Sequence, residues 1–283
     1  MDVRILLFFL FFMLSCNYYS DRSQKVYSSP AGYDLGSPVR YRVRESMQEI
    51  SGIALYPDER RILAINDEEG KIFEIDVKAT KAYPTWKFGK NDDYEDLCET
   101  DSGFFVLKSN GSLFRIFNLF TDSVYSVHYK FGKKGKKEFE TAYFDKNKNR
   151  IITICKNCED DKKLGVTSAY SFRLDNMAFE SDPVYRLDDQ EITRLAGNEM
   201  RFFKPSAAAI HPIEKRLYIV ASVNQLLVIA DLEGHVQEAY NLRHRLFLQP
   251  EGLAFAPNGD MYISNEGGYD GVANILKFTY KKK

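Results

Sequence analysis

The stretch that decides the fold reads Gln249-Pro250-Glu251-Gly252-Leu253-Ala254, and four upstream phrases share its outline. The five phrases begin at residues 49, 93, 138, 204 and 249, so all but one of the spacings are 44 or 45 residues. A period of roughly 40–50 residues with strand-like content is typical of the blades of a β-propeller. The sequence therefore predicts an all-β fold in which each phrase opens the innermost strand of one blade.

Turn chemistry supports this interpretation. The first repeat predicts strands at 51–55, 61–65 and 71–76, separated by a Pro-Asp turn and a polar break. The last repeat has a Pro-Asn-Gly turn at the matching place; Pro presets φ there, and Asn and Gly tolerate the left-handed region. Short strands with closely spaced turns indicate an all-β array.

The longer gap between the third and fourth phrases bears on the number of blades. The third repeat completes four strands by residue 187, which leaves 188–203 as a connection with a helical segment at 191–200. Because this remainder is too short for four strands, we expect five four-stranded antiparallel blades around a central channel, with six blades as the alternative. A strand at 38–44 is expected to join the last blade and close the ring, which protects the sheet edges.

The N-terminus has the features of a targeting segment. A basic residue and an apolar run at 5–14 precede Met13-Leu14-Ser15-Cys16, which resembles a bacterial lipobox. We therefore expect a lipoprotein-type signal peptide at 1–16 with Cys16 lipidated, a flexible tether at 17–35 and one propeller domain at 36–283. An ordinary signal peptide is the alternative. Lipidation would place the protein in the cell envelope, membrane-anchored and facing the periplasm or the exterior.

Composition limits the partners. The 283 residues carry a formal net charge of −1, which gives no indication of a nucleic-acid partner, and we expect a monomer. The Cys155–Cys158 spacing allows either a local disulfide or two idle thiols, and a second pair for zinc is missing.

The third position of the phrase predicts a ring at the channel mouth. Its members are Ser51, Glu95, Glu140, Ser206 and Glu251. Three ionised glutamates held together would repel strongly unless a proton or a hard cation neutralises them. Calcium accepts six to eight oxygen ligands in flexible geometry. We therefore predict calcium bound by Glu95, Glu140 and Glu251, with an empty or water-filled ring as the alternative.

Further polar residues are expected at the same face. The first phrase position supplies Glu49, Asp93, Glu138, Lys204 and Gln249. The breaks after the second strands add Asn66, Asp67, Lys108, Lys156, Asn265 and Glu266. These residues either line a ligand entrance or form a solvated rim, and turn capping is the simpler role for Asp67 and Glu266.

The five phrases in this order, together with Asn66-Asp67-Glu68-Glu69-Gly70-Lys71-Ile72, resemble the SdiA-regulated family of exported bacterial proteins over roughly residues 38–280. The resemblance implies a five-bladed propeller, distantly related to NHL-repeat propellers, with calcium at a shared site. It implies no established activity. The lysine-rich stretch at 133–137 and the Cys155–Cys158 pair depart from the family pattern.

Candidate catalytic groups are few. The four histidines, His128, His211, His235 and His244, all lie outside the channel register, and the chain lacks a serine nucleophile elbow. We therefore expect a membrane-anchored, calcium-binding module that holds an unknown small ligand or protein at its channel face. The alternatives are a calcium-dependent hydrolase of the lactonase or phosphoesterase type and an assembly scaffold.

Overall fold

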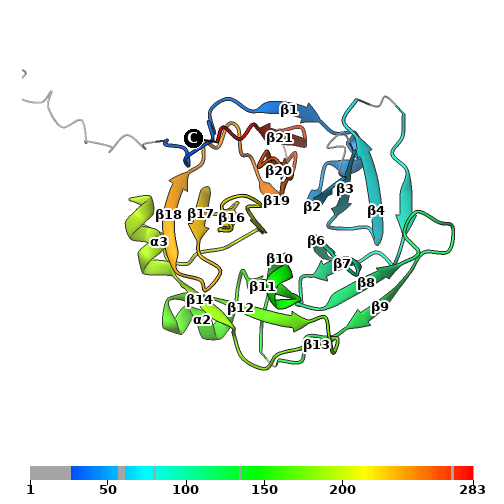
Figure 1. The fold of residues 1–283 in the computed structure, drawn as a ribbon, viewed down its shortest axis with the longest axis horizontal. Coiled ribbons are helices and arrows are strands. Elements are labelled where there is room, and N and C mark those ends of the chain that lie inside the picture. Colours follow the sequence, from blue (N-terminus) through cyan, green and yellow to red (C-terminus); the bar gives the residue numbers. More distant parts are fainter. Residues whose placement is uncertain (1–26, 57–60, 79–80, 134, 269–270, 283) are drawn as a thin grey trace, which may run out of the picture.

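The strands form a five-bladed β-propeller in the computed structural model, which describes residues 27–56, 61–78, 81–133, 135–268 and 271–282 (Figure 1). The five sheets follow one another around the ring, and the inner strands of neighbouring blades contact each other. The predicted fold is confirmed.

Each phrase opens the inner strand of its blade. Blade one contains β2 (Ile50–Leu55), β3 (Arg61–Asn66), β4 (Lys71–Asp76) and β5 (Thr85–Lys87). Blade two contains β6 (Tyr94–Thr100), β7 (Gly103–Lys108), β8 (Leu113–Phe117) and β9 (Tyr125–Tyr129). Blade three contains β10 (Phe139–Asp145), β11 (Arg150–Cys155), β12 (Val166–Arg173), β13 (Ala178–Phe179) and β14 (Tyr185–Asp188). Blade four contains β15 (Ala207–Ile210), β16 (Leu217–Ala221), β17 (Leu226–Ala230) and β18 (Val236–Asn241).

The last blade joins the two ends of the described chain. It contains β19 (Pro250–Phe255), β20 (Met261–Asn265), β21 (Asn274–Phe278) and β1 (Val39–Arg42). Strand β1 pairs antiparallel with β21, and Tyr41 lies opposite Ile275. The predicted closure by a strand within 38–44 is therefore confirmed, and this pairing covers the edge of the sheet.

The gap between the third and fourth phrases contains a helix, α3 (Asp189–Ala196), instead of a sixth blade. The Asp188 side chain caps it by accepting hydrogen bonds from the amides of Gln190 and Glu191, and Gly197 ends it with a φ of 65°. A second helix, α2 (Glu159–Leu164), lies in the charged loop after β11, where the sequence predicts only a loop. Within the described residues, no helix is long and apolar enough to cross a membrane.

The expected tether at 17–35 ends earlier than its composition indicates. Tyr33 and Leu35 are buried in the apolar cluster between blades four and five. The Tyr33 hydroxyl donates to the Gly259 carbonyl (2.5 Å) and lies 2.8 Å from His211 Nε2. These residues therefore pack as part of the propeller. Residues 1–26, including Cys16, lie outside the described residues.

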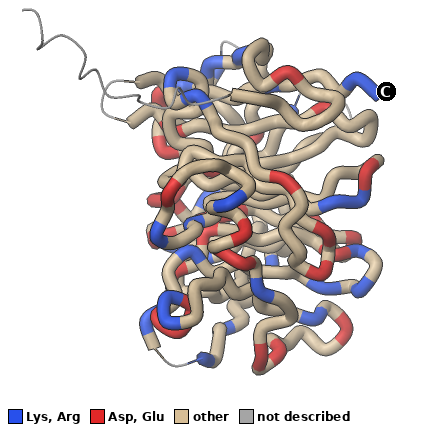
Figure 2. Tube along the Cα trace, turned by 90° about the vertical axis from the view of Figure 1, so that its left-hand side faces the viewer, with Lys and Arg blue, Asp and Glu red and all other residues tan. Residues whose placement is uncertain are grey.

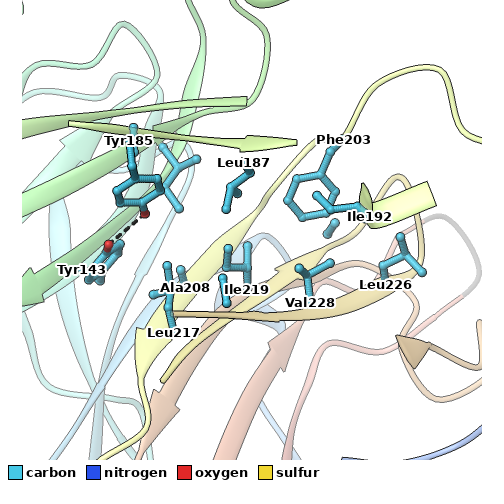
Figure 3. Close-up of a cluster of buried hydrophobic side chains, with 14 of the residues drawn as sticks. Tyr143, Tyr185, Leu187, Ile192, Phe203, Ala208, Leu217, Ile219, Leu226 and Val228 are labelled. Carbon is cyan, nitrogen blue, oxygen red and sulfur yellow. Dashed lines mark hydrogen bonds between the residues drawn. The ribbon is translucent and has the colours of Figure 1, made fainter. Parts of the chain in front are cut away.

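The hydrophobic core lies between the blades, with one apolar cluster at each of the five interfaces. Figure 3 shows the cluster between blades three and four, where Leu187 faces Ile219 and the hydroxyls of Tyr143 and Tyr185 lie 2.8 Å apart. Lys and Arg are interspersed with Asp and Glu along the trace (Figure 2), in keeping with the net charge of −1.

Candidate functional site

The third position of the phrase coincides with an irregularity in four of the five inner strands. The pairing register shifts between Ile50 and Ile53, Tyr94 and Asp96, Phe139 and Thr141, and Pro250 and Gly252. Glu95, Glu140 and Glu251 are therefore the extra residues at their bulges. A β-bulge leaves one residue out of the ladder and re-aims its side chain. The repeated phrase thus encodes a bulge that takes each glutamate out of regular pairing.

The ring serines bond between blades. In blade four, the Ser206 hydroxyl donates to the Pro250 carbonyl of blade five (2.5 Å). The Ser51 carbonyl in turn accepts a hydrogen bond from the Ser264 hydroxyl (2.8 Å). The two serine positions of the predicted ring therefore hold neighbouring blades together.

Lys156, directly after β11, supplies positive charge among the glutamates. Its ammonium group forms an ion pair with the Glu140 carboxylate, and the Glu140 side chain is only 9% exposed. The same ammonium interacts electrostatically with Glu95, Glu251 and Glu266. Sequence reasoning placed Lys156 at this face but did not identify it as the counter-charge of the glutamates.

Three of these carboxyl groups have strongly raised pKa values. Burial, reinforced by the charge of Asp93, raises the pKa of Glu95 to about 9. Burial raises the pKa of Glu251 to about 7, although the charge of Lys156 opposes the increase. Burial and then the charge of Glu251 raise the pKa of Glu266 to about 8. Carboxyl groups with strongly shifted pKa values cluster at functional sites, which makes this face of the channel a candidate site.

A second group of carboxylates lies where blades one and five meet. Glu49, Asp67 and Glu266 each present an oxygen within 4.8 Å of the others; we call them the outer trio. The Asp67 amide donates to the Glu49 carbonyl (3.3 Å), and the Glu266 amide donates to the Gln249 carbonyl (2.9 Å). The Gln249 side-chain amide also donates to the Glu266 carboxylate. Asp67 and Glu266, which follow the second strands of their blades, are therefore positioned by backbone hydrogen bonds to the first residue of the phrase in the same blade.

The Asp67 carboxylate is partly buried and not fully hydrogen-bonded among the described residues. Burial, reinforced by the charges of Glu49 and Glu68, raises its pKa to about 6. Its Oδ1 atom is buried and lacks a hydrogen-bond partner among the described residues, as do Glu140 Oε2 and Asn265 Oδ1. Buried polar atoms without partners are rare and call for an explanation such as a bound ion or water.

The predicted metal triad is arranged differently from the outer trio. Lys156 pairs with Glu140 and interacts electrostatically with Glu95 and Glu251, but the group of three carboxylates within 4.8 Å found among the described residues is the outer trio. Calcium at the predicted triad stays a prediction. The sequence predicts the three residues of the outer trio only as channel-lining or turn-capping residues, because their convergence depends on how blades one and five meet.

The first residues of the other three phrases, Asp93, Glu138 and Lys204, make different contacts. The Glu138 carboxylate accepts from Asn157 Nδ2 (3.0 Å), and its carbonyl accepts from the Lys156 amide (2.8 Å). The Lys204 amide donates to Asn224 Oδ1 (2.8 Å), and Asp93 is exposed beside Glu95. Only Glu138 contributes directly to positioning Lys156.

A disulfide between Cys155 and Cys158 closes the loop that carries Lys156, and both cysteines are buried. Of the two alternatives left open by the sequence, the structure has the disulfide. Such a crosslink restricts the loop in the unfolded chain.

Asp96 lies at a close approach of the inner strands of blades one, two and three, which sequence reasoning missed. Its carboxylate accepts from the Leu97 amide (2.8 Å) and from the Ala142 amide of blade three (2.7 Å). A Cβ atom on Gly52 of blade one would lie 2.4 Å from Asp96 Oδ1. Beyond this point, a cavity of about 270 Å³ lined mainly by apolar residues opens at the other end of the inner strands. The only sequence signal was the fourth phrase position, which is glycine in blades one and five.

No protein-family model and no curated protein matches the sequence, but solved β-propellers match its structure. Glutaminyl cyclase from Myxococcus xanthus has a TM-score of 0.55 at 11% identity, covering 87% of this chain and 98% of that chain. Regucalcin from Agrobacterium tumefaciens, a calcium-binding protein, has a TM-score of 0.50 at 12% identity, covering 89% and 96%. A luciferin-regenerating enzyme has a TM-score of 0.50 at 10% identity, covering 86% and 95%. At such identities the likeness establishes the fold alone.

Proposed function

We propose that this chain is a calcium-binding β-propeller that holds a small ligand or a protein segment at its acidic channel face. The observation that carries the proposal is the outer trio, in which Glu49, Asp67 and Glu266 meet within 4.8 Å. One Asp67 oxygen there is buried and has no hydrogen-bond partner within the part of the chain that the structure describes. A cation would satisfy that oxygen and offset the repulsion among the three carboxylates.

The donor chemistry fits calcium. The trio offers carboxylate oxygens, and the neighbouring Asn265 offers a buried amide oxygen to which no described residue donates a hydrogen bond. Calcium takes oxygen ligands in variable number and geometry, whereas zinc prefers nitrogen and sulfur. Glu49 is exposed, so an ion held there keeps coordination positions open to solvent or to an oxygen of a ligand.

The ion would also stabilise the ring. The trio comes from blades one and five, and blade five contains both β1 and β21. An ion bound only by the folded chain stabilises it by mass action. Lipidation at Cys16, membership of the SdiA-regulated family and a location in the cell envelope complete the proposal, which a Cys16→Ala variant tests by its release from membranes.

A calcium-dependent hydrolase is the second candidate, because Glu95 has a pKa of about 9 and so stays protonated at neutral pH. A carboxylic acid of that kind can act as a general acid beside an ion that polarises a carbonyl or phosphoryl oxygen. Calcium-dependent turnover in a panel of lactones and phosphodiesters would favour this candidate over a pure binding module.

The test is thermal unfolding of the full chain with calcium and with EGTA. An ion present at about 100 times its Kd stabilises by about 2.7 kcal/mol, or roughly 5–10 °C in Tm. Asp67→Asn should abolish most of that increase. Asp92→Asn is the matched control, because Asp92 lies on the same face but pairs with Lys108 (2.7 Å). An equal calcium effect in both variants would contradict the assignment, and metal analysis of the purified protein detects an ion too tightly held to remove.

A further inference from the structure

Lys156 is held rigidly at the base of its side chain. Its own amide donates to the Glu138 carbonyl (2.8 Å), and the Asn157 amide donates to the same oxygen (3.1 Å). The Cys155–Cys158 disulfide closes the loop on either side. The position from which the ammonium group reaches into the channel is therefore set by blade three.

The Lys156 ammonium group lies close to the carboxylates of the inner ring. It pairs with Glu140, whose side chain is 9% exposed and whose other oxygen, Oε2, has no partner among the described residues. It also interacts electrostatically with Glu95 and Glu251, the two other glutamates of the ring. A buried carboxylate that loses its counter-charge is strongly destabilising. Lys156 thus supplies a counter-charge to Glu140 at the position where the sequence predicts a metal ion.

Lys108 provides an internal comparison. It ends β7 of blade two, much as Lys156 follows β11 of blade three, and its side chain is similarly exposed, at 22% against 19%. Its ammonium group pairs with Asp92 (2.7 Å), which is outside the glutamate ring. The two lysines lie one register position apart, because Lys108 pairs with Tyr94 where Cys155 pairs with Phe139. Of the two, Lys156 is the one that pairs with a glutamate of the ring.

We infer that Lys156 is a tethered cation that occupies the inner position formed by Glu95, Glu140 and Glu251 and competes there with divalent ions. In the wild-type chain the divalent ion then binds at the outer trio, and its affinity is limited by the nearby ammonium charge. Removing that charge opens the inner position to a second ion. The metal part of this inference rests on the proposed function, whereas the counter-ion role of Lys156 does not.

The counter-ion role is tested without metal. In EGTA, Lys156→Gln should lower the Tm of the full chain by at least about 6 °C, because Glu140 loses its partner. Adding Glu140→Gln to that variant should restore at least half of the loss, since the buried charge is then removed. Lys108→Gln should change the Tm by less than about 2 °C. Additive losses in the double variant, or equal effects of the two lysine variants, would overturn the counter-ion role.

The competition is tested by calorimetric titration with calcium chloride. Lys156→Gln should bind a second ion or bind calcium at least about tenfold more tightly than the wild type, because like charges close together repel. Lys108→Gln should stay within about threefold, since its charge is further from the ring. Equal calcium binding by both variants would overturn the competition. An absence of calcium binding in every variant would refute the proposed function, and the metal-free thermal cycle would still decide the role of Lys156.

Discussion

Gly52 is a position at which adding a single methyl group should strongly destabilise the fold. A Cβ atom there would lie 2.2 Å from the Leu97 backbone nitrogen and 2.6 Å from the Asp96 Cα atom, both in the inner strand of blade two. Ordinary contacts are about 3.5–4.0 Å, so the two inner strands would have to separate by roughly 1 Å. The obstacle is backbone, which cannot rotate away as a side chain can.

We expect Gly52→Ala to lower the free energy of unfolding by at least about 3 kcal/mol, at the upper end of the usual cost of overpacking. For a chain of this size that corresponds to a Tm lower by roughly 6–12 °C. Calcium affinity should fall as well, because Gly52 lies in β2, the strand that directly follows Glu49 of the outer trio. Urea unfolding and calcium titration of the same preparation measure both effects.

Gly132→Ala is the matched control. Gly132 is exposed, and a Cβ atom there would have nothing within 4 Å. This variant should therefore unfold within about 0.5 kcal/mol of the wild type. If Gly52→Ala were as stable as Gly132→Ala, the close approach of the two inner strands would be wrong, and so would the conclusion that residue 52 has to be glycine.

Two further predictions concern pH and the disulfide. In chelator, stability should fall as pH rises from about 5 to about 9, because the raised pKa values of Glu251 (about 7) and Glu266 (about 8) make the folded chain bind more protons than the unfolded chain. Thermal melts at constant ionic strength measure this slope; calcium should reduce it, and a rise in stability with pH would contradict the assignment. Replacing Cys155 and Cys158 together by serine should cost about 2 kcal/mol, the loop-entropy value for so short a loop, or roughly 4–8 °C in Tm. Dithiothreitol should produce a similar loss in the wild type, and a Tm unaffected by both treatments would show that the crosslink does not stabilise the chain.

Most of the fold could be predicted because its determinants are local or repeated. The Pro-Asn-Gly turn before β20 and the spacing of the phrases identified the strands, and the short remainder at 188–203 favoured five blades over six, which the structure confirms. The alternating segment at 38–44 identified the closing strand. Helix α2 and the burial of Tyr33 were missed, since both depend on packing against other parts of the ring.

The candidate site was predicted only in part. The recurring glutamate was visible as a pattern, but the bulge that re-aims Glu95, Glu140 and Glu251 is a property of strand pairing. Likewise, Lys156 was one of several polar residues after second strands, and nothing local distinguished it from Lys108.

The sequence by itself determined the propeller fold, the closing strand and the face at which acidic side chains gather, because a repeat of constant register brings equivalent residues to equivalent places. It favoured five blades over six, and the structure confirmed five. Only the tertiary structure decided which of those residues meet. Glu49, Asp67 and Glu266 converge because blades one and five are adjacent in the closed ring, although most of the chain separates them in sequence. Lys156 reaches the glutamates because the loop after β11 is fixed to Glu138. The distances between blades depend on how their side chains pack, and the spacing of a sequence repeat does not determine that packing.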